Sequence, residues 1–204
     1  MPSEFTDRYY PTVCIRRAEM RAMKNLPLGE KQKMLPVVLL APWLNSILFD
    51  NTIKIVADCV GDIPIIADVD RYFESNSDLP SRVYWRSLLD AETGHIEWMK
   101  LITRQDNYIP TIQTFGRTDD QIQYQIDIAV SLDRGLVFRF ELNRSNEFER
   151  IFPYISRYMS DKLLCIFDYG YGDPTDLTEG VISGLAEKLI EIDESARFVV
   201  SGSS

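Results

Sequence analysis

Short apolar runs alternate with longer segments of helical periodicity along the chain. Residues 35–41 (LPVVLLA) form a continuous apolar run with β-branched residues, which is typical of a strand buried on both faces. Thr118 and Gln121 have the spacing of a capping box and predict a helix that begins there. Gly61 stands where a helix that ends near Val60 would take a glycine in a left-handed conformation.

The same patterns along the whole chain predict strands and helices in strict alternation. The expected strands are residues 12–15, 35–41, 63–67, 109–113, 136–142, 163–167 and 197–201. The expected helices are residues 18–26, 45–60 with Asn45 or Ser46 as cap, 91–104, 118–132, 145–159 with Ser145 as cap, and 178–192 with Thr178 as cap. Residues 70–87 are expected to hold a further short helix. Such alternation implies parallel strands joined by right-handed crossovers.

Two architectures have this pattern, the doubly wound open sheet and the barrel. The glycine-rich dinucleotide fingerprint is absent after the first strand, and no Walker A motif is present. The strands recur about every 25 residues, which is close to the repeat of a (β/α)₈ barrel. We therefore predict an α/β fold of the parallel (β/α) barrel-like (TIM-barrel-like) type. The pattern stops after the seventh strand, so we expect a single domain over residues 1–204 that is truncated at its C-terminal end.

Composition narrows the class of protein. The formal net charge is −9 and the pI is about 4.7, so general binding to nucleic acid is not expected. The first ten residues lack the basic and apolar regions of a signal peptide, and no apolar run is long enough to span a bilayer. The three cysteines lie far apart in apolar runs. These features predict a cytoplasmic protein that does not act in the membrane.

The candidate site follows from the strand ends, because barrel ligands bind at the C-terminal ends of the strands. Polar and charged residues expected there are Arg16, Glu19, Asp68, Gln113, Arg139, Glu141 and Asp168. In the fifth strand, side chains alternate across the sheet. If Phe138 and Phe140 face the helices, Arg139 and Glu141 point into the barrel.

Two interpretations of these residues stay open. One is a polar pocket in which arginines bind an anionic ligand. The other is an internal salt-bridge network that fills the upper layer of the barrel. No cofactor is expected, and the alternative is Mg²⁺ or Mn²⁺ held by Asp68, Glu141 and Asp168.

Several short motifs resemble the phage-type "beta protein" family, which is found in phages, prophages and bacteria. They are residues 10–13 (Tyr-Pro-Thr-Val) with Arg16, residues 18–23 (Ala-Glu-Met-Arg-Ala-Met), residues 35–38 (Leu-Pro-Val-Val), Arg139, Asp168 and residues 199–204. The chain departs from the family pattern at Pro42-Trp43, where the family has a more polar strand end. The resemblance implies a barrel-like fold, a longer full-length protein and a link to phage–host conflict. It assigns no residue a catalytic role.

The leading hypothesis is a phage or prophage accessory protein that binds a small anionic ligand, or a phage or host protein partner, at the barrel mouth. The first alternative is a metal-dependent phosphoester hydrolase. The second is a non-catalytic interaction scaffold. The sequence does not indicate an oligomeric state.

Overall fold

The chain divides into two units. A computed structural model describes residue 5 and residues 8–141, 146–171 and 176–203. One unit is Arg8–Pro110, and the other is Thr111–Ser204 together with Met1–Asp7. The prediction of a single domain over residues 1–204 stays a prediction.

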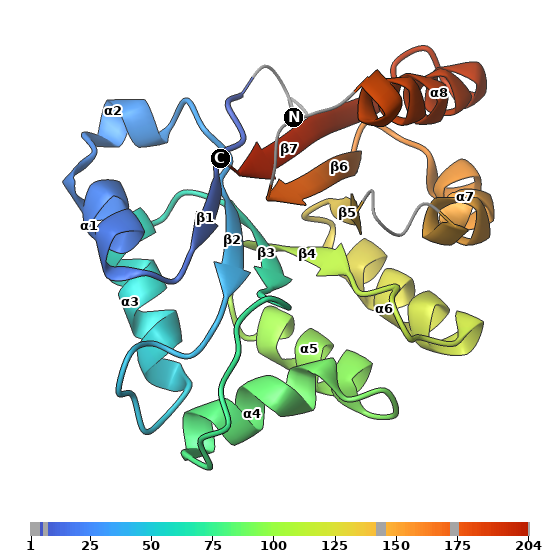
Figure 1. Ribbon diagram of the computed structural model, residues 1–204. Helices are drawn as coiled ribbons and strands as arrows, with labels where there is room; N and C mark the ends of the chain where they lie inside the picture. Colours follow the sequence, from blue (N-terminus) through green and yellow to red (C-terminus); the bar gives the residue numbers. More distant parts are fainter. Residues whose placement is uncertain (1–4, 6–7, 142–145, 172–175, 204) are drawn as a thin grey trace. The chain divides into compact units, whose positions relative to one another are not determined.

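Seven parallel strands follow one another in sequence order, and helices separate them (Figure 1). The strands are β1 (Thr12–Cys14), β2 (Val37–Leu40), β3 (Ile65–Val69), β4 (Tyr108–Ile112), β5 (Leu136–Glu141), β6 (Leu163–Tyr171) and β7 (Arg197–Ser203). The helices are α1 (Arg17–Asn25), α2 (Leu28–Lys31), α3 (Asp50–Val60), α4 (Pro80–Leu89), α5 (Gly94–Thr103), α6 (Asp119–Leu132), α7 (Asn146–Tyr158) and α8 (Asp176–Ile192). This order confirms the predicted α/β, parallel barrel-like fold.

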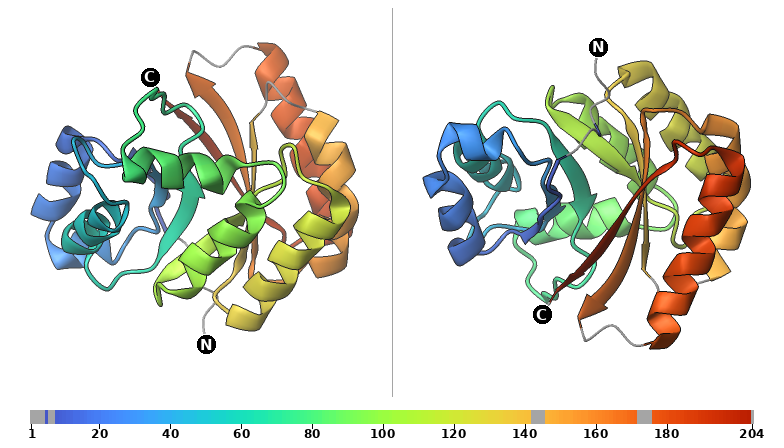
Figure 2. Two further views of the ribbon diagram at one scale, coloured as in Figure 1. Left: turned by 90° about the horizontal axis from the view of Figure 1, so that it is seen from below. Right: turned by 90° about the horizontal axis from the view of Figure 1, so that it is seen from above.

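In the unit Arg8–Pro110, the core is built on β2 and β3. Every residue of these two strands is buried, as expected for parallel strands covered on both faces. The helices α1 and α3 lie side by side beside them (Figure 2). Gly61 ends α3 with φ 72°, and its N–H donates to the carbonyl of Ala57. The predicted role of Gly61 is thereby confirmed.

In the other unit, α6, α7 and α8 lie along one side of β5 to β7 (Figure 2). Phenylalanine rings fill the layer between them. Phe140 lies 5.1 Å from Phe148 and 6.2 Å from Phe167 between ring centroids. At the start of β7, Arg197 Nη1 donates to the carbonyl of Phe5 at 2.8 Å, which fixes this N-terminal residue to the last strand.

Two predicted helix caps are wrong. The helix α3 begins at Asp50, because residues 43–49 form a connection that is bonded to α4 instead. Ser46 does not cap a helix; its carbonyl accepts hydrogen bonds from Ser81 Oγ and Arg82 Nη1 at 2.6 and 3.1 Å. Asn45 has φ 58°, a left-handed conformation that a cap does not take.

The third predicted cap is wrong as well. The helix α8 begins at Asp176, so Thr178 lies inside its first turn. The predicted cap Ser145 lies outside the described residues.

The three cysteines are free thiols. Cys59 and Cys165 are buried and Cys14 is half-buried, in agreement with their apolar sequence context. Burial raises the pKa of the Cys165 thiol and of the Cys59 thiol, because the interior disfavours the thiolate. Among the described residues, no helix is both long and apolar enough to cross a membrane.

The capping box of α6 gives a first test of the fold. The Thr118 side chain accepts from the Gln121 N–H, and the Gln121 side chain accepts from the Thr118 N–H at 3.1 Å. Thr118→Ala should lower the free energy of unfolding by about 1 kcal/mol, measured by urea denaturation. Thr118→Ser keeps the acceptor oxygen and should stay within about 0.5 kcal/mol of the wild type. Equal stability of all three proteins would contradict this role.

Candidate functional site

A row of polar side chains lies at the ends of β5, β6 and β7. Glu141 is in register with Asp168, and Asp168 is in register with Ser201, so these three side chains share one face of the sheet. They are only 5%, 5% and 9% exposed. Arg139 lies on the same face two residues before Glu141, while Phe138 and Phe140 lie on the opposite face with the helices. The predicted alternation along this strand is confirmed.

A buried ion pair joins two members of this group. Arg139 Nε donates to Asp168 Oδ2 at 2.9 Å, and Arg139 Nη2 donates to the same oxygen. The other carboxylate oxygen of Asp168 accepts from the Gly170 N–H at 2.8 Å. The side chains of Arg139 and Asp168 are 5% and 6% exposed. The pair therefore holds the guanidinium in a fixed orientation at the strand ends.

The end of β4 is held by an amide from α6. Gln125 is fully buried, and its side chain accepts from the Gln113 N–H at 3.0 Å and donates to the Gln113 carbonyl at 2.9 Å. The Gln113 side chain accepts from Arg117 Nη2 at 3.0 Å, and Arg117 is only 6% exposed. The sequence reasoning missed Gln125 and Arg117. The sequence did carry a signal for Gln125, since its helical spacing places it on the apolar face of α6 with Ile122 and Ile126, where a polar side chain needs a buried partner.

A third arginine fixes the connection between β4 and α6. From α7, Arg150 Nη2 donates to the Thr114 carbonyl at 2.8 Å and Arg150 Nη1 donates to the Arg117 carbonyl at 3.2 Å. It also forms ion pairs with Asp119 and Glu147, at 3.4 and 3.7 Å. The connection that carries Arg117 is thus held from both α6 and α7.

The remaining candidate residues lie in the unit Arg8–Pro110. Arg16 and Glu19 form an ion pair at 4.0 Å, and their side chains are 63% and 32% exposed. Glu19 also accepts from the Cys14 N–H at the end of β1. Asp68 lies inside β3, is 1% exposed, and accepts from the Val69 N–H at 2.7 Å. These three residues therefore form the strand-end polar groups of their own unit.

The seven predicted site residues are divided between the units. Gln113, Arg139, Glu141 and Asp168 belong to one, and Arg16, Glu19 and Asp68 to the other. In the parts of the chain that the structure describes, no group of three or more His, Cys, Asp or Glu side chains could hold a metal ion. The alternative with Mg²⁺ or Mn²⁺ on Asp68, Glu141 and Asp168 stays a prediction that no observed geometry supports.

Comparison with known proteins gives the family. The model of the family described as "Beta protein" matches residues 9–204. The chain belongs to the Beta protein family. It is 25% identical over 198 residues to "Protein beta" of Enterobacteria phage P4, a match that covers 96% of this chain and 54% of that protein. This Beta protein family member thus spans about half the length of the curated relative it matches.

The match confirms the resemblance seen in the sequence, and it makes the chain a phage-related protein. No solved structure matches it. The residues of the strand-end site therefore have to be interpreted from their own geometry.

The buried ion pair makes a prediction about stability. Asp168→Asn keeps the size of the side chain but leaves the Arg139 guanidinium buried without its carboxylate. The free energy of unfolding should fall by about 3–5 kcal/mol, measured by urea denaturation. In the double variant Arg139→Met, Asp168→Leu, both charges are gone, and the loss should be smaller than for Asp168→Asn alone.

The matched control is an exposed ion pair in the same unit. Lys162 Nζ lies 2.6 Å from Asp133 Oδ1, with side chains 43% and 77% exposed. Lys162→Gln should change the stability by less than about 1 kcal/mol. If Asp168→Asn were no more destabilising than Lys162→Gln, the ion pair would not support the strand ends.

Proposed function

We propose that this phage-related Beta protein family member is a binding protein whose strand ends in the unit with residues 111–204 bind a small anionic ligand. The observation that carries the proposal is the Arg139–Asp168 pair, which orients a buried guanidinium at the ends of β5 and β6. The C-terminal ends of parallel strands are where barrel-type folds bind their ligands.

The cost of burial supports a use for these groups. Charged side chains in an apolar interior are costly unless they are paired, and their mutual attraction often only offsets the loss of hydration. Apolar residues would fill the same layer at equal or lower free energy. A row of Arg139, Glu141, Asp168 and Ser201 at the strand ends is therefore better explained by ligand binding than by stability alone.

The arginines support an anion as the ligand. A guanidinium offers N–H donors in a planar fork that matches carboxylate and phosphate oxygens. Arg117 is buried next to Gln113, and Arg150 holds the backbone of the same connection. Three arginines thus gather around the ends of β4 and β5. Asp168 pairs with Arg139, and Asp119 and Glu147 pair with Arg150, so carboxylates and hydrogen bonds hold these guanidinium groups in place.

Ligand binding can be tested by thermal unfolding with a panel of phosphate, pyrophosphate and AMP. A ligand that binds only the folded protein stabilises it by about 2.7 kcal/mol at a hundred times its Kd. We expect at least one of these anions to raise the Tm of the wild type. Arg139→Lys keeps the charge but not the fork, and it should weaken binding by about tenfold or more.

Lys162→Gln is the control for the loss of one positive charge in the same unit, and it should leave the anion-induced Tm shift unchanged. Arg117→Gln gives a second, independent variant if Arg139→Lys folds poorly. A wild type whose Tm no anion changes would contradict the proposal and favour the interaction scaffold. Equal shifts in the wild type and both arginine variants would place anion binding elsewhere.

A phage or host protein as partner, a role in phage–host conflict and a cytoplasmic location belong to the same proposal. They rest on the relation to a phage protein and on the composition of the chain. Pull-down with the purified chain from phage-infected and uninfected cells would test the partner directly.

A further inference from the structure

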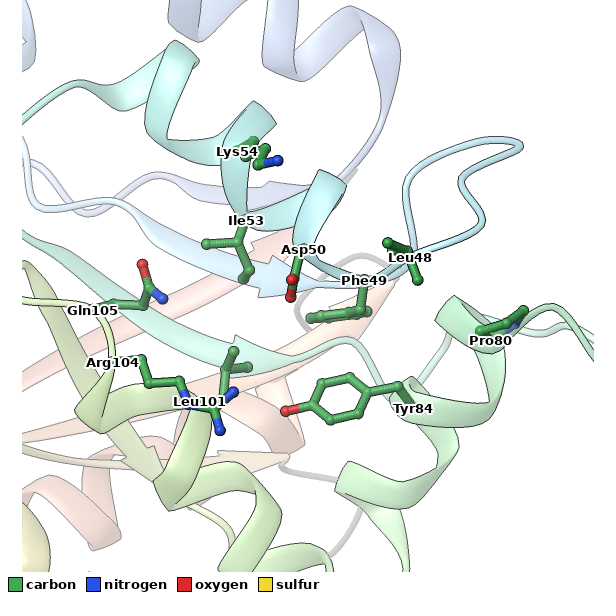
Figure 3. A pocket seen from close by; sticks show the side chains of 10 residues that line it. All are labelled: Leu48, Phe49, Asp50, Ile53, Lys54, Pro80, Tyr84, Leu101, Arg104 and Gln105. Carbon is green, nitrogen blue, oxygen red and sulfur yellow. The ribbon is translucent and has the colours of Figure 1, made fainter.

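A pocket in the unit Arg8–Pro110 is separate from the strand ends discussed above. It has a volume of about 480 Å³ and lies between α3, α4 and α5 (Figure 3). This volume is in the range of sites for small molecules. The lining residues that matter for binding are Phe49, Asp50, Lys54, Tyr84, Leu101 and Arg104.

One part of the pocket is apolar and aromatic. Phe49 and Leu101 are each only 4% exposed, so their contact surface is fixed by the core. The ring of Phe49 lies 5.3 Å from the ring of Tyr84, at an angle of 52°. Ile53 and Pro80 extend the apolar surface (Figure 3). A flat apolar body could pack against these rings as aromatic side chains pack against each other.

The other part of the pocket carries charge. The Arg104 guanidinium and the Tyr84 hydroxyl point toward each other, and the Asp50 side chain points toward them from the start of α3 (Figure 3). Neither Lys54 nor Arg104 forms an ion pair with any residue that the structure describes. Two cations and one carboxylate leave a net charge of +1, which attracts an anion.

The Tyr84 phenol adds a donor. Burial raises its pKa, the Glu97 and Asp50 carboxylates raise it further, and Arg104 opposes them. The phenol therefore keeps its proton at neutral pH and can donate to an anionic oxygen next to Arg104.

We propose that this pocket binds an aromatic carboxylate, with the ring against Phe49 and Leu101 and the carboxylate on Arg104 and the Tyr84 hydroxyl. The site is independent of the anion site proposed at the strand ends, because none of its lining residues belongs to the unit that carries that site. A carboxylate fits the guanidinium through two parallel hydrogen bonds, and the net positive charge of the pocket attracts it.

The test is calorimetric titration of the full chain with 2-naphthoate. The neutral 2-naphthamide serves as the comparison ligand. We expect 2-naphthoate to bind at least tenfold more tightly than the amide. Arg104→Gln should weaken naphthoate binding at least tenfold, and Tyr84→Phe, which keeps the ring, should weaken it about three- to tenfold.

The control variant is Lys33→Gln. Lys33 is an exposed lysine of the same unit that pairs with Glu30 at 2.9 Å, outside the pocket. Lys33→Gln removes one positive charge, as Arg104→Gln does, and it should leave the Kd for naphthoate within twofold of the wild-type value. The proposal is overturned if naphthoate does not bind, if the amide binds equally well, or if Arg104→Gln and Lys33→Gln have the same effect. Binding at the strand ends instead would show as sensitivity to Arg139→Lys but not to Arg104→Gln.

Discussion

The alternation of side chains along β5 constrains the whole unit that contains it. Phe138 and Phe140 belong to the aromatic layer under α7, with Phe140 in ring contact with Phe148. Because a strand has a period of two, this placement forces Arg139 and Glu141 onto the opposite face. A charged residue there needs a partner, and β6 supplies the Asp168 carboxylate, which pairs with Arg139. The alternation of side chains along β5 thus produces both the aromatic layer on one face and the polar site on the other.

The sequence predicted most where the periodicity is strong and local. The positions of the buried strands, the α6 capping box and the alternation of side chains along β5 all follow from short-range patterns, and the structure has each of them. The start of α3 was wrong because a tertiary bond decides it. Ser46 has a good sequence context for a cap, but its carbonyl is bonded to Ser81, which lies 35 residues further along the chain.

The candidate site could be predicted only in part, because some of its residues are fixed by contacts between distant parts of the chain. Strand-end residues could be found from the strand positions, but Arg117 is buried by contacts that its own neighbours do not reveal. Its connection is held by Arg150 from 33 residues away. The pocket between α3, α4 and α5 could not be expected either. Its lining residues come from three helices and from the chain next to them, and they combine buried residues such as Phe49 and Leu101 with exposed ones such as Lys54 and Arg104.

The amide of Gln125 has a consequence for how this part of the chain can vary. The side-chain amide accepts from the N–H of Gln113 and donates to its carbonyl. It thus satisfies the same backbone groups that a neighbouring strand would satisfy. A glutamate in its place would have no donor, and a lysine would have no acceptor. These two hydrogen bonds fix the position of α6 along β4. Arg150 fixes the connection between β4 and α6 through the carbonyls of Thr114 and Arg117. Insertions or deletions between Gln113 and Thr118 would therefore have to be absorbed without any shift of α6, so this connection should tolerate changes of length poorly although it lies in a loop.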